Sequence, residues 1–201
     1  MALLGVSATL ALVWVWPLPA LAHDLFAAYM VQHLISMNVA ALLLGTTLPP
    51  IDLYGGRPLL TLPIASALQM AALWIWHMPA VFSAVHHAMD LQALMHLSLF
   101  AAALLFWKGV LQQRGKAIWH SIFALLITAK IYCMLGAALV FSRRPLYPQF
   151  GGPDAWGLTH LEDQQLAGLI MVSSCALIYV AAAILLFARW LFTPEERAIV
   201  Q

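Results

Sequence analysis

The stretch LAGLIMVSSCALIYVAAAILLF, residues 166–187, runs for 22 positions without a charged residue or a proline. An α-helix of roughly 20 apolar residues crosses a hydrocarbon core about 30 Å thick. This stretch therefore predicts a transmembrane helix, and similar apolar segments precede it along the chain. In total we predict six spans, near residues 2–21, 24–46, 60–79, 89–111, 117–141 and 163–191.

The composition of the whole chain supports a membrane protein. Hydrophobic residues make up 64% of the 201 residues, charged residues make up 8%, and the mean hydropathy is +0.90. Since a soluble domain carries about 25% charged residues, we predict an all-α, polytopic transmembrane helix bundle, surrounded by membrane lipid, that forms a single domain over residues 1–201. The net charge of +1 offers no basic surface for phosphates, which excludes nucleic acid as a partner.

The first apolar segment has features of both a leader and a span. Ala20-Leu21-Ala22 resembles a signal-peptidase site, but no Lys or Arg precedes the apolar run. We therefore expect this segment to be retained as a transmembrane span.

Lys and Arg are distributed unevenly between the two sides of the predicted bundle. One side has only Arg143 and Arg144, whereas the other carries Arg57, Lys108, Arg114, Lys116, Arg189 and Arg197. Cytoplasmic loops are enriched in Lys and Arg. The second side is therefore predicted to be cytoplasmic, with both termini on it.

Histidines gather in the outer half of the bilayer in this topology. At 1.5 Å per residue, His33 lies roughly 14 Å and His96 roughly 10 Å below the outer ends of their spans, and His77 lies within about one turn of an outer end. Ionisable side chains at such depth are costly and usually mark a site or a pathway. Hydrogen bonding between helices is the alternative explanation.

Thioethers and imidazoles share helix faces in two of the predicted spans. In the second span, the positions i, i+3 and i+7 are Met30, His33 and Met37. The fourth span repeats this spacing with Met89, Gln92 and His96. Soft sulfur beside imidazole favours Cu(I), although a single Met in a membrane protein is more often a packing residue. The combined pattern predicts a copper-handling site in the outer half of the bundle.

The remaining polar residues suggest no catalytic chemistry. Cys133 and Cys175 both lie inside apolar runs, so neither a disulfide framework nor a CxxC motif is present. No nucleophile, base and orienting group occur together, and we expect the protein not to be an enzyme. Lys130 lies near the middle of the fifth predicted span, where it must be paired, neutral or exposed to a hydrated cavity.

Six short sequences resemble the CtaG family, the caa3-type cytochrome c oxidase assembly proteins. They are MVQH at 30–33, WHMP at 76–79, MHLS at 95–98, LFW at 105–107, PLYP at 145–148 and LEDQQLAGLIM at 161–171. The resemblance runs from about residue 25 to residue 192, and LEDQQ is its most specific part. It implies a multi-pass protein of the bacterial inner membrane that acts as a copper metallochaperone for the respiratory chain and helps deliver Cu(I) to the CuB centre of a haem-copper oxidase.

The resemblance also implies copper ligands at His33, His77 and His96. This chain departs from the family at two positions: Gln92 stands where a His is common, one turn before His96, and Met95 stands where a Glu is common. A histidine from the segment joining the third and fourth spans is a candidate replacement. Further candidate ligands are therefore Met37, Met30, His86, His87 and Met171.

Three polar residues are expected to support the site without binding metal: Asp163, Gln92 and Gln164. Asp163 and Gln164 open the sixth predicted span, where capping of the helix is a sufficient explanation for a carboxylate. Alternatively, Asp163 orients a histidine that binds the metal.

The expected partners are subunit I of the oxidase and a periplasmic copper donor. Two other functions compete with copper delivery. One is a non-catalytic structural subunit or scaffold of a respiratory complex, in which the same side chains only form hydrogen bonds. The other, less favoured, is a protein that binds haem b between His33 and His96.

Overall fold

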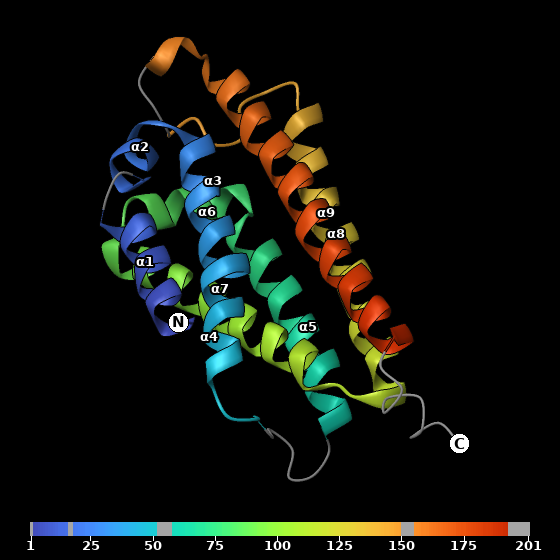
Figure 1. Ribbon diagram of the computed structural model, residues 1–201. Coiled ribbons are helices and arrows are strands. Elements are labelled where there is room, and N and C mark those ends of the chain that lie inside the picture. Colours follow the sequence, from blue (N-terminus) through green and yellow to red (C-terminus); the bar gives the residue numbers. More distant parts are fainter. Residues whose placement is uncertain (1, 16–17, 52–57, 150–154, 193–201) are drawn as a thin grey trace.

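The computed structural model describes residues 2–15, 18–51, 58–149 and 155–192, and every regular element within these ranges is helical (Figure 1). The α-helices are α1 (Ala2–Trp14), α2 (Leu18–Asp24), α3 (Phe26–Ile35), α4 (Ala41–Thr47), α5 (Pro58–Trp76), α6 (Pro79–His86), α7 (Met89–Gln112), α8 (Ile118–Phe141) and α9 (His160–Phe192). A π-helical segment, η1 (Ser36–Ala40), joins α3 to α4, and the short 3₁₀ turns are η2 (Gly115–Ala117) and η3 (Ala155–Gly157). The prediction of an all-α membrane bundle is confirmed.

Within the described ranges, five helical stretches are long and apolar enough to cross a membrane. They are Leu4–Asp24, Phe26–Thr47, Met89–Gln112, Gly115–Phe141 and His160–Phe192. A sixth crossing results when α5 and α6, which meet at a bend, are taken as one broken span. The chain is a multi-pass membrane protein, and the predicted spans match these stretches closely.

The third predicted span is not straight. α5 ends at Trp76, and α6 begins at Pro79 after a bend of 73°. Proline is favoured in the first turn of a helix, and the residue before it is extended, as Met78 is here with φ −65° and ψ 127°. The loop expected around His86 and His87 is instead α6, with His86 as its last residue. That expectation was wrong because Pro79 starts a new helix as well as ending the previous one.

The antiparallel helices α8 and α9 pack together along most of their length (Figure 1). At their crossing, a Cβ atom on Gly168 would lie 2.7 Å from the carbonyl oxygen of Gly136, and one on Gly136 would lie 2.9 Å from that of Gly168. Small residues allow two membrane helices to approach closely, and the resulting van der Waals contact drives their association in lipid. The bundle thereby gains a closely packed helix pair, and α3 packs against α9.

A buried polar network joins this pair to the rest of the bundle. The side-chain nitrogen of Gln69 lies 2.9 Å from the hydroxyl oxygens of both Tyr132 and Tyr179. The indole of Trp107 stacks on Tyr179 with ring centroids 5.4 Å apart, and its Nε1–H donates to the carbonyl oxygen of Met37 at 3.0 Å. Side chains from α5, α7, α8 and α9 are thus fixed relative to the π-helical segment η1.

The two ends of the bundle carry different charges. Figure 1 places α2 and the start of α9 at one end, which we call the α2 end, whereas the ends of α4 and α7 lie at the other. Arg143 and Arg144 lie at the α2 end, whereas four basic residues lie toward the opposite end: Lys108, Arg114, Lys116 and Arg189. Two further basic residues of the charge count, Arg57 and Arg197, lie outside the described residues.

We expect a topology reporter fused after Gln201 to read as cytoplasmic and one inserted near Gly152 to read as periplasmic. The reason is the excess of Lys and Arg on one side of the predicted bundle, six residues against two. Reporter activity in intact cells measures both positions. The reverse result would place the histidine-rich end in the cytoplasm and contradict copper supply from outside.

Candidate metal site

Three histidines of the bundle share one local geometry. In each, the ring Nδ1–H donates to the carbonyl oxygen four residues earlier, at 2.8 Å for His33, 2.7 Å for His77 and 2.8 Å for His96. A carbonyl oxygen only accepts hydrogen bonds, so the proton of the neutral ring is on Nδ1 and the lone pair is on Nε2. Histidines that bind metals through Nε2 are oriented by this kind of hydrogen bond at the other nitrogen.

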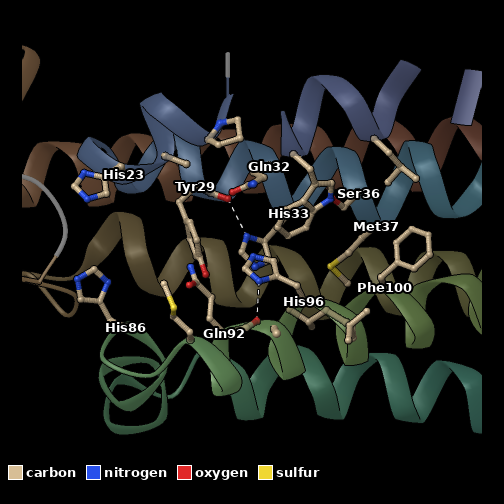
Figure 2. Close-up of a pocket in the computed structure, with 18 residues that line it drawn as sticks. His23, Tyr29, Gln32, His33, Ser36, Met37, His86, Gln92, His96 and Phe100 are labelled. Carbon is tan, nitrogen blue, oxygen red and sulfur yellow. Dashed lines mark hydrogen bonds between the residues drawn. The ribbon is translucent and has the colours of Figure 1, made fainter. Parts of the chain in front are cut away.

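His33 and His96 lie face to face. Their ring centroids are 4.6 Å apart and their planes differ by 26°, as the centre of Figure 2 shows. The Nε2 atoms of both rings are buried and have no hydrogen-bond partner among the described residues. Ten buried side-chain nitrogen and oxygen atoms lack a partner among the described residues, and these two lie on adjacent, stacked rings. Because buried polar atoms are usually hydrogen-bonded, the two Nε2 atoms make this position a candidate ligand site.

His77 also lies near His33. Its ring centroid is 6.5 Å from that of His33, and the two planes differ by 71°. The residue is 5% exposed, and its carbonyl oxygen accepts a hydrogen bond from the Tyr147 hydroxyl at 2.6 Å. The structure therefore brings His77 near the pair but not into direct stacking with it.

A cavity of about 880 Å³ opens beside the histidine pair, between α1, α2, α3 and α7 (Figure 2). His33, His96 and the Met37 side chain line its deeper part, and His23 and His86 lie near the α2 end of the same cavity. Most of the remaining lining is apolar. The cavity therefore extends from the α2 end of the bundle to His33 and His96.

The predicted site residues divide into two groups. Besides the pair itself, the cavity is lined by Met37, Gln92 and His86, and by Met89 from the α7 stripe. The other candidates, His77, His87, Met30 and Met171, do not line it. Met30 and Met171 are each 2% exposed and belong to the hydrophobic core. Met30 and Met37 would lie on the same face of a regular α-helix, but Met37 lies in the π-helical segment η1 and only it lines the cavity with His33.

Within the described ranges, no group of three or more His, Cys, Asp or Glu side chains is arranged to hold a metal ion. Zinc sites usually require four ligands of this kind. Away from the α2 end, the donors that line the cavity are the imidazoles of His33 and His96 and the Met37 thioether. This set suits a soft ion that accepts few ligands.

Several neighbours of the pair were not expected from the sequence. The Trp14 ring meets His96 edge-on with centroids 4.6 Å apart, and Tyr29 contacts His33 at 4.5 Å. The Tyr29 hydroxyl also interacts with the side chain of Gln92. Gln32 donates to the carbonyl oxygen of Val13 at 2.9 Å and ties α3 to α1. Two of these neighbours had a signal in the sequence: Tyr29 lies about one helical turn before His33, and Gln32 directly precedes it.

Asp163 positions the helix that carries His33. Its carboxylate oxygens accept hydrogen bonds from the backbone N–H groups of Phe26, at 2.7 Å, and Ala27, at 2.9 Å. These are the first two residues of α3, where a negative charge is favourable against the helix dipole. Asp163 therefore caps a helix distant in sequence, and within the described part of the chain its carboxylate is not hydrogen-bonded to a histidine ring.

Gln164 holds the connection between α8 and α9. Its side-chain oxygen accepts from the backbone N–H of Leu146 at 2.5 Å, and its nitrogen donates to the carbonyl oxygens of Leu139 and Arg144 at 3.3 and 3.4 Å. Tyr147, which directly follows Leu146, donates to the His77 carbonyl oxygen. Gln164 thus acts on the site through the backbone.

Comparison with known proteins places this chain in a protein family. The model of the family described as cytochrome c oxidase caa3 assembly factor (Caa3_CtaG) matches residues 2–192. No curated protein and no solved structure matches the chain.

Proposed function

Because the chain belongs to the family of cytochrome c oxidase caa3 assembly factors, we propose that it assists the oxidase by binding Cu(I) and delivering it to the CuB centre. The observation that carries this proposal is the pair of stacked imidazoles, His33 and His96, whose buried Nε2 atoms lack partners. Copper is cargo in this function, and the protein holds it temporarily. Membership in a family of assembly factors is in keeping with a non-catalytic role.

The donor set favours Cu(I) over harder ions. Imidazole nitrogen binds copper well, and thioether sulfur selects its reduced form. His33, His96 and Met37 offer these donors in one cavity, and the wall beside them is mostly apolar. An apolar wall disfavours Mg²⁺ and Ca²⁺, which need several oxygen ligands. Cu(I) is stable with few ligands, so two imidazoles and one thioether are sufficient.

The cavity supplies a route for the ion. His23, His86 and Met89 line it near the α2 end, with Met89 88% exposed, and the histidine pair lies deeper. A Cu(I) ion entering from the α2 end would pass from exposed donors to buried ones. Copper supply from the periplasmic side requires this end to face outward, as the charge distribution predicts.

The stacking of the His33 and His96 rings also affects how a Cu(I) ion would be released. Two stacked rings do not direct both lone pairs to one point, so joint coordination requires at least one ring to rotate. His96 is only partly buried, whereas His33 is 5% exposed, and the His96 ring therefore has more freedom. A ligand that must rotate to bind the ion can also rotate to give it up, which suits transfer to a partner.

The same geometry argues against a haem between the two histidines. In bis-histidine haem ligation the porphyrin plane lies between the two imidazoles. Ring centroids 4.6 Å apart leave no space for a porphyrin. Copper is the better-supported cargo, and haem b binding would require the helices α3 and α7 to separate.

We expect the protein, purified under reducing conditions, to bind Cu(I) in a titration against a colourimetric Cu(I) chelator and to show no haem absorption. Metal analysis and an absorption spectrum of the same sample measure both properties. A haem spectrum would support the haem alternative. A preparation that binds neither group, yet restores oxidase assembly in cells, would establish the scaffold alternative.

A further inference from the structure

The α8 surface that faces away from the bundle contains a lysine in mid-membrane. Lys130 is exposed, and its neighbours along the same face are Phe123, Ile127 and Met134, of which Phe123 is 67% and Met134 52% exposed. We call these four residues the Lys130 face. At 1.5 Å per residue, Lys130 lies roughly 18 Å from the start of α8 and roughly 17 Å from its end. It is therefore near the centre of the span.

A lysine at this position has no means of neutralisation within the described part of the chain. Lys130 makes no hydrogen bond or ion pair there. Its four-carbon side chain covers only part of the distance to either membrane surface. Charged side chains at the bilayer centre are costly and almost always pair or face a hydrated cavity. The exposed position of Lys130 thus leaves its ammonium group available to a partner from outside this bundle.

Lys108, by contrast, is a buried lysine whose ammonium group has hydrogen-bond partners. Its ammonium group donates to the carbonyl oxygens of Gly45, at 3.0 Å, and Leu48 at the end of α4. The residue is 6% exposed and stabilises the C-terminal end of that helix. No comparable contact exists for Lys130 among the described residues.

A groove adjoins the Lys130 face. It has a volume of about 670 Å³ and runs between α5 and α8, with Pro63 and Met70 on one wall and Phe123 and Ile127 on the other. Its lining is almost entirely apolar. A transmembrane helix placed in this groove would also meet Lys130, which lies one turn beyond Ile127.

We propose that the groove and the Lys130 face bind a transmembrane helix of the oxidase that carries an Asp or Glu near mid-membrane depth. The proposal rests on membership of the assembly-factor family and not on copper binding. A carboxylate is the group that pairs with an ammonium ion in a low-dielectric environment. The interhelical ion pair would fix the depth and orientation of the oxidase relative to the copper cavity.

Charge argues against a second copy of this chain as the occupant. A symmetric dimer through the Lys130 face would bring two lysines to the same depth. The acidic residues that the structure describes, Asp24, Asp90, Glu162 and Asp163, lie at helix ends and cannot reach that depth. A different protein must therefore supply the carboxylate.

Photo-crosslinking in native membranes tests the proposal. A photo-crosslinking side chain in place of Met134 should capture a membrane subunit of the oxidase, whereas the same side chain in place of Leu177 should not. Leu177 is the matched control, because it is 70% exposed on α9, away from the groove. Lys130→Gln should lower the Met134 crosslink by roughly tenfold or more, as removal of one member of a buried charge pair does. Lys130→Arg should preserve it.

Exchange of the two charges identifies the carboxylate. Lys130→Glu should abolish the crosslink, and replacing the proposed acidic residue of the captured subunit by Lys should restore it in that background. Equal crosslinking in wild type and Lys130→Gln, a crosslink only between two copies of this chain, or no crosslinked protein at all would each overturn the proposal. His33→Ala should leave the crosslink unchanged, so failure here is distinguishable from failure of the copper proposal.

Discussion

Replacing either His33 or His96 by Ala is expected to abolish high-affinity Cu(I) binding while leaving the protein folded in detergent. Loss of an outer hydrogen-bond partner of a metal ligand already lowers affinity by roughly 10- to 100-fold, so loss of the ligand itself should cost more. The fold should survive, because each ring is hydrogen-bonded only to a backbone carbonyl oxygen of its own helix, and one such hydrogen bond contributes only about 0.5 to 1.5 kcal/mol. Titration against a Cu(I) chelator measures the affinity.

The matched control is His120→Ala. His120 lies at the end of the bundle opposite the cavity, so its loss should leave Cu(I) affinity unchanged. Met37→Leu should weaken binding less than either change at the histidine pair, since thioethers are weaker and more exchangeable ligands. In cells, His33→Ala and His96→Ala should lower oxidase activity with haem insertion intact, and added copper should partly restore it. Normal oxidase assembly with full Cu(I) affinity in both variants would show that the ligand assignment is wrong.

The second large effect is expected at the crossing of α8 and α9. Gly168→Leu should prevent recovery of folded protein, and Gly168→Ala should destabilise it by about 1 to 3 kcal/mol, the usual range for overpacking. A Cβ atom at position 168 would lie 2.7 Å from the Gly136 carbonyl oxygen and 2.9 Å from the Leu139 Cβ atom. Relief of that contact requires the two helices to separate. Thermal unfolding of the purified protein in detergent measures the change.

Gly45→Ala provides the comparison. A Cβ atom there would be 3.6 Å from the nearest atom, on Leu111, which is an ordinary van der Waals contact. Because Ala has a higher helix propensity than Gly, this change should be neutral or slightly stabilising. If both variants unfolded at the same temperature, close packing of α8 on α9 would not be what stabilises the bundle.

Hydropathy and length were sufficient to predict the helical spans. The segments near 24–46, 89–111 and 117–141 appear in the structure as Phe26–Thr47, Met89–Gln112 and Gly115–Phe141. This success has a simple cause: each span must satisfy its backbone hydrogen bonds internally and be apolar over the thickness of the membrane. Both requirements are local in sequence.

The features that the sequence did not predict depend on contacts between distant segments. Asp163 caps α3 across 137 positions, and no local pattern identifies its partner. The π-helical segment η1 has no simple sequence signature, although it contains Met37, whose carbonyl oxygen binds Trp107. The bend before Pro79 had a local signal, because a proline can begin a helix as well as end one.

Helical spacing, which is also local in sequence, predicted part of the candidate site. The stripe containing Gln92 and His96 lines the cavity because helical spacing places its members on one face. Met30 and Met37 both belong to the hydrophobic core, and seven positions apart they would share a face of a regular α-helix, yet only Met37, in the π-helical segment η1, also lines the cavity. Which of the two thioethers lines the cavity depends on this π-helical turn and on how α3 packs against its neighbours, and this information is not contained in the spacing.

X-ray absorption spectroscopy at the copper edge, on protein loaded with Cu(I), tests the central claim most directly. We expect a Cu(I) spectrum with nitrogen scattering typical of imidazole and a sulfur contribution from one thioether, matching His33, His96 and Met37. His33→Ala and His96→Ala should retain too little copper to give a spectrum, and in Met37→Leu the sulfur signal should disappear. A spectrum without imidazole scattering, or a protein that retains no copper on loading, would contradict the account.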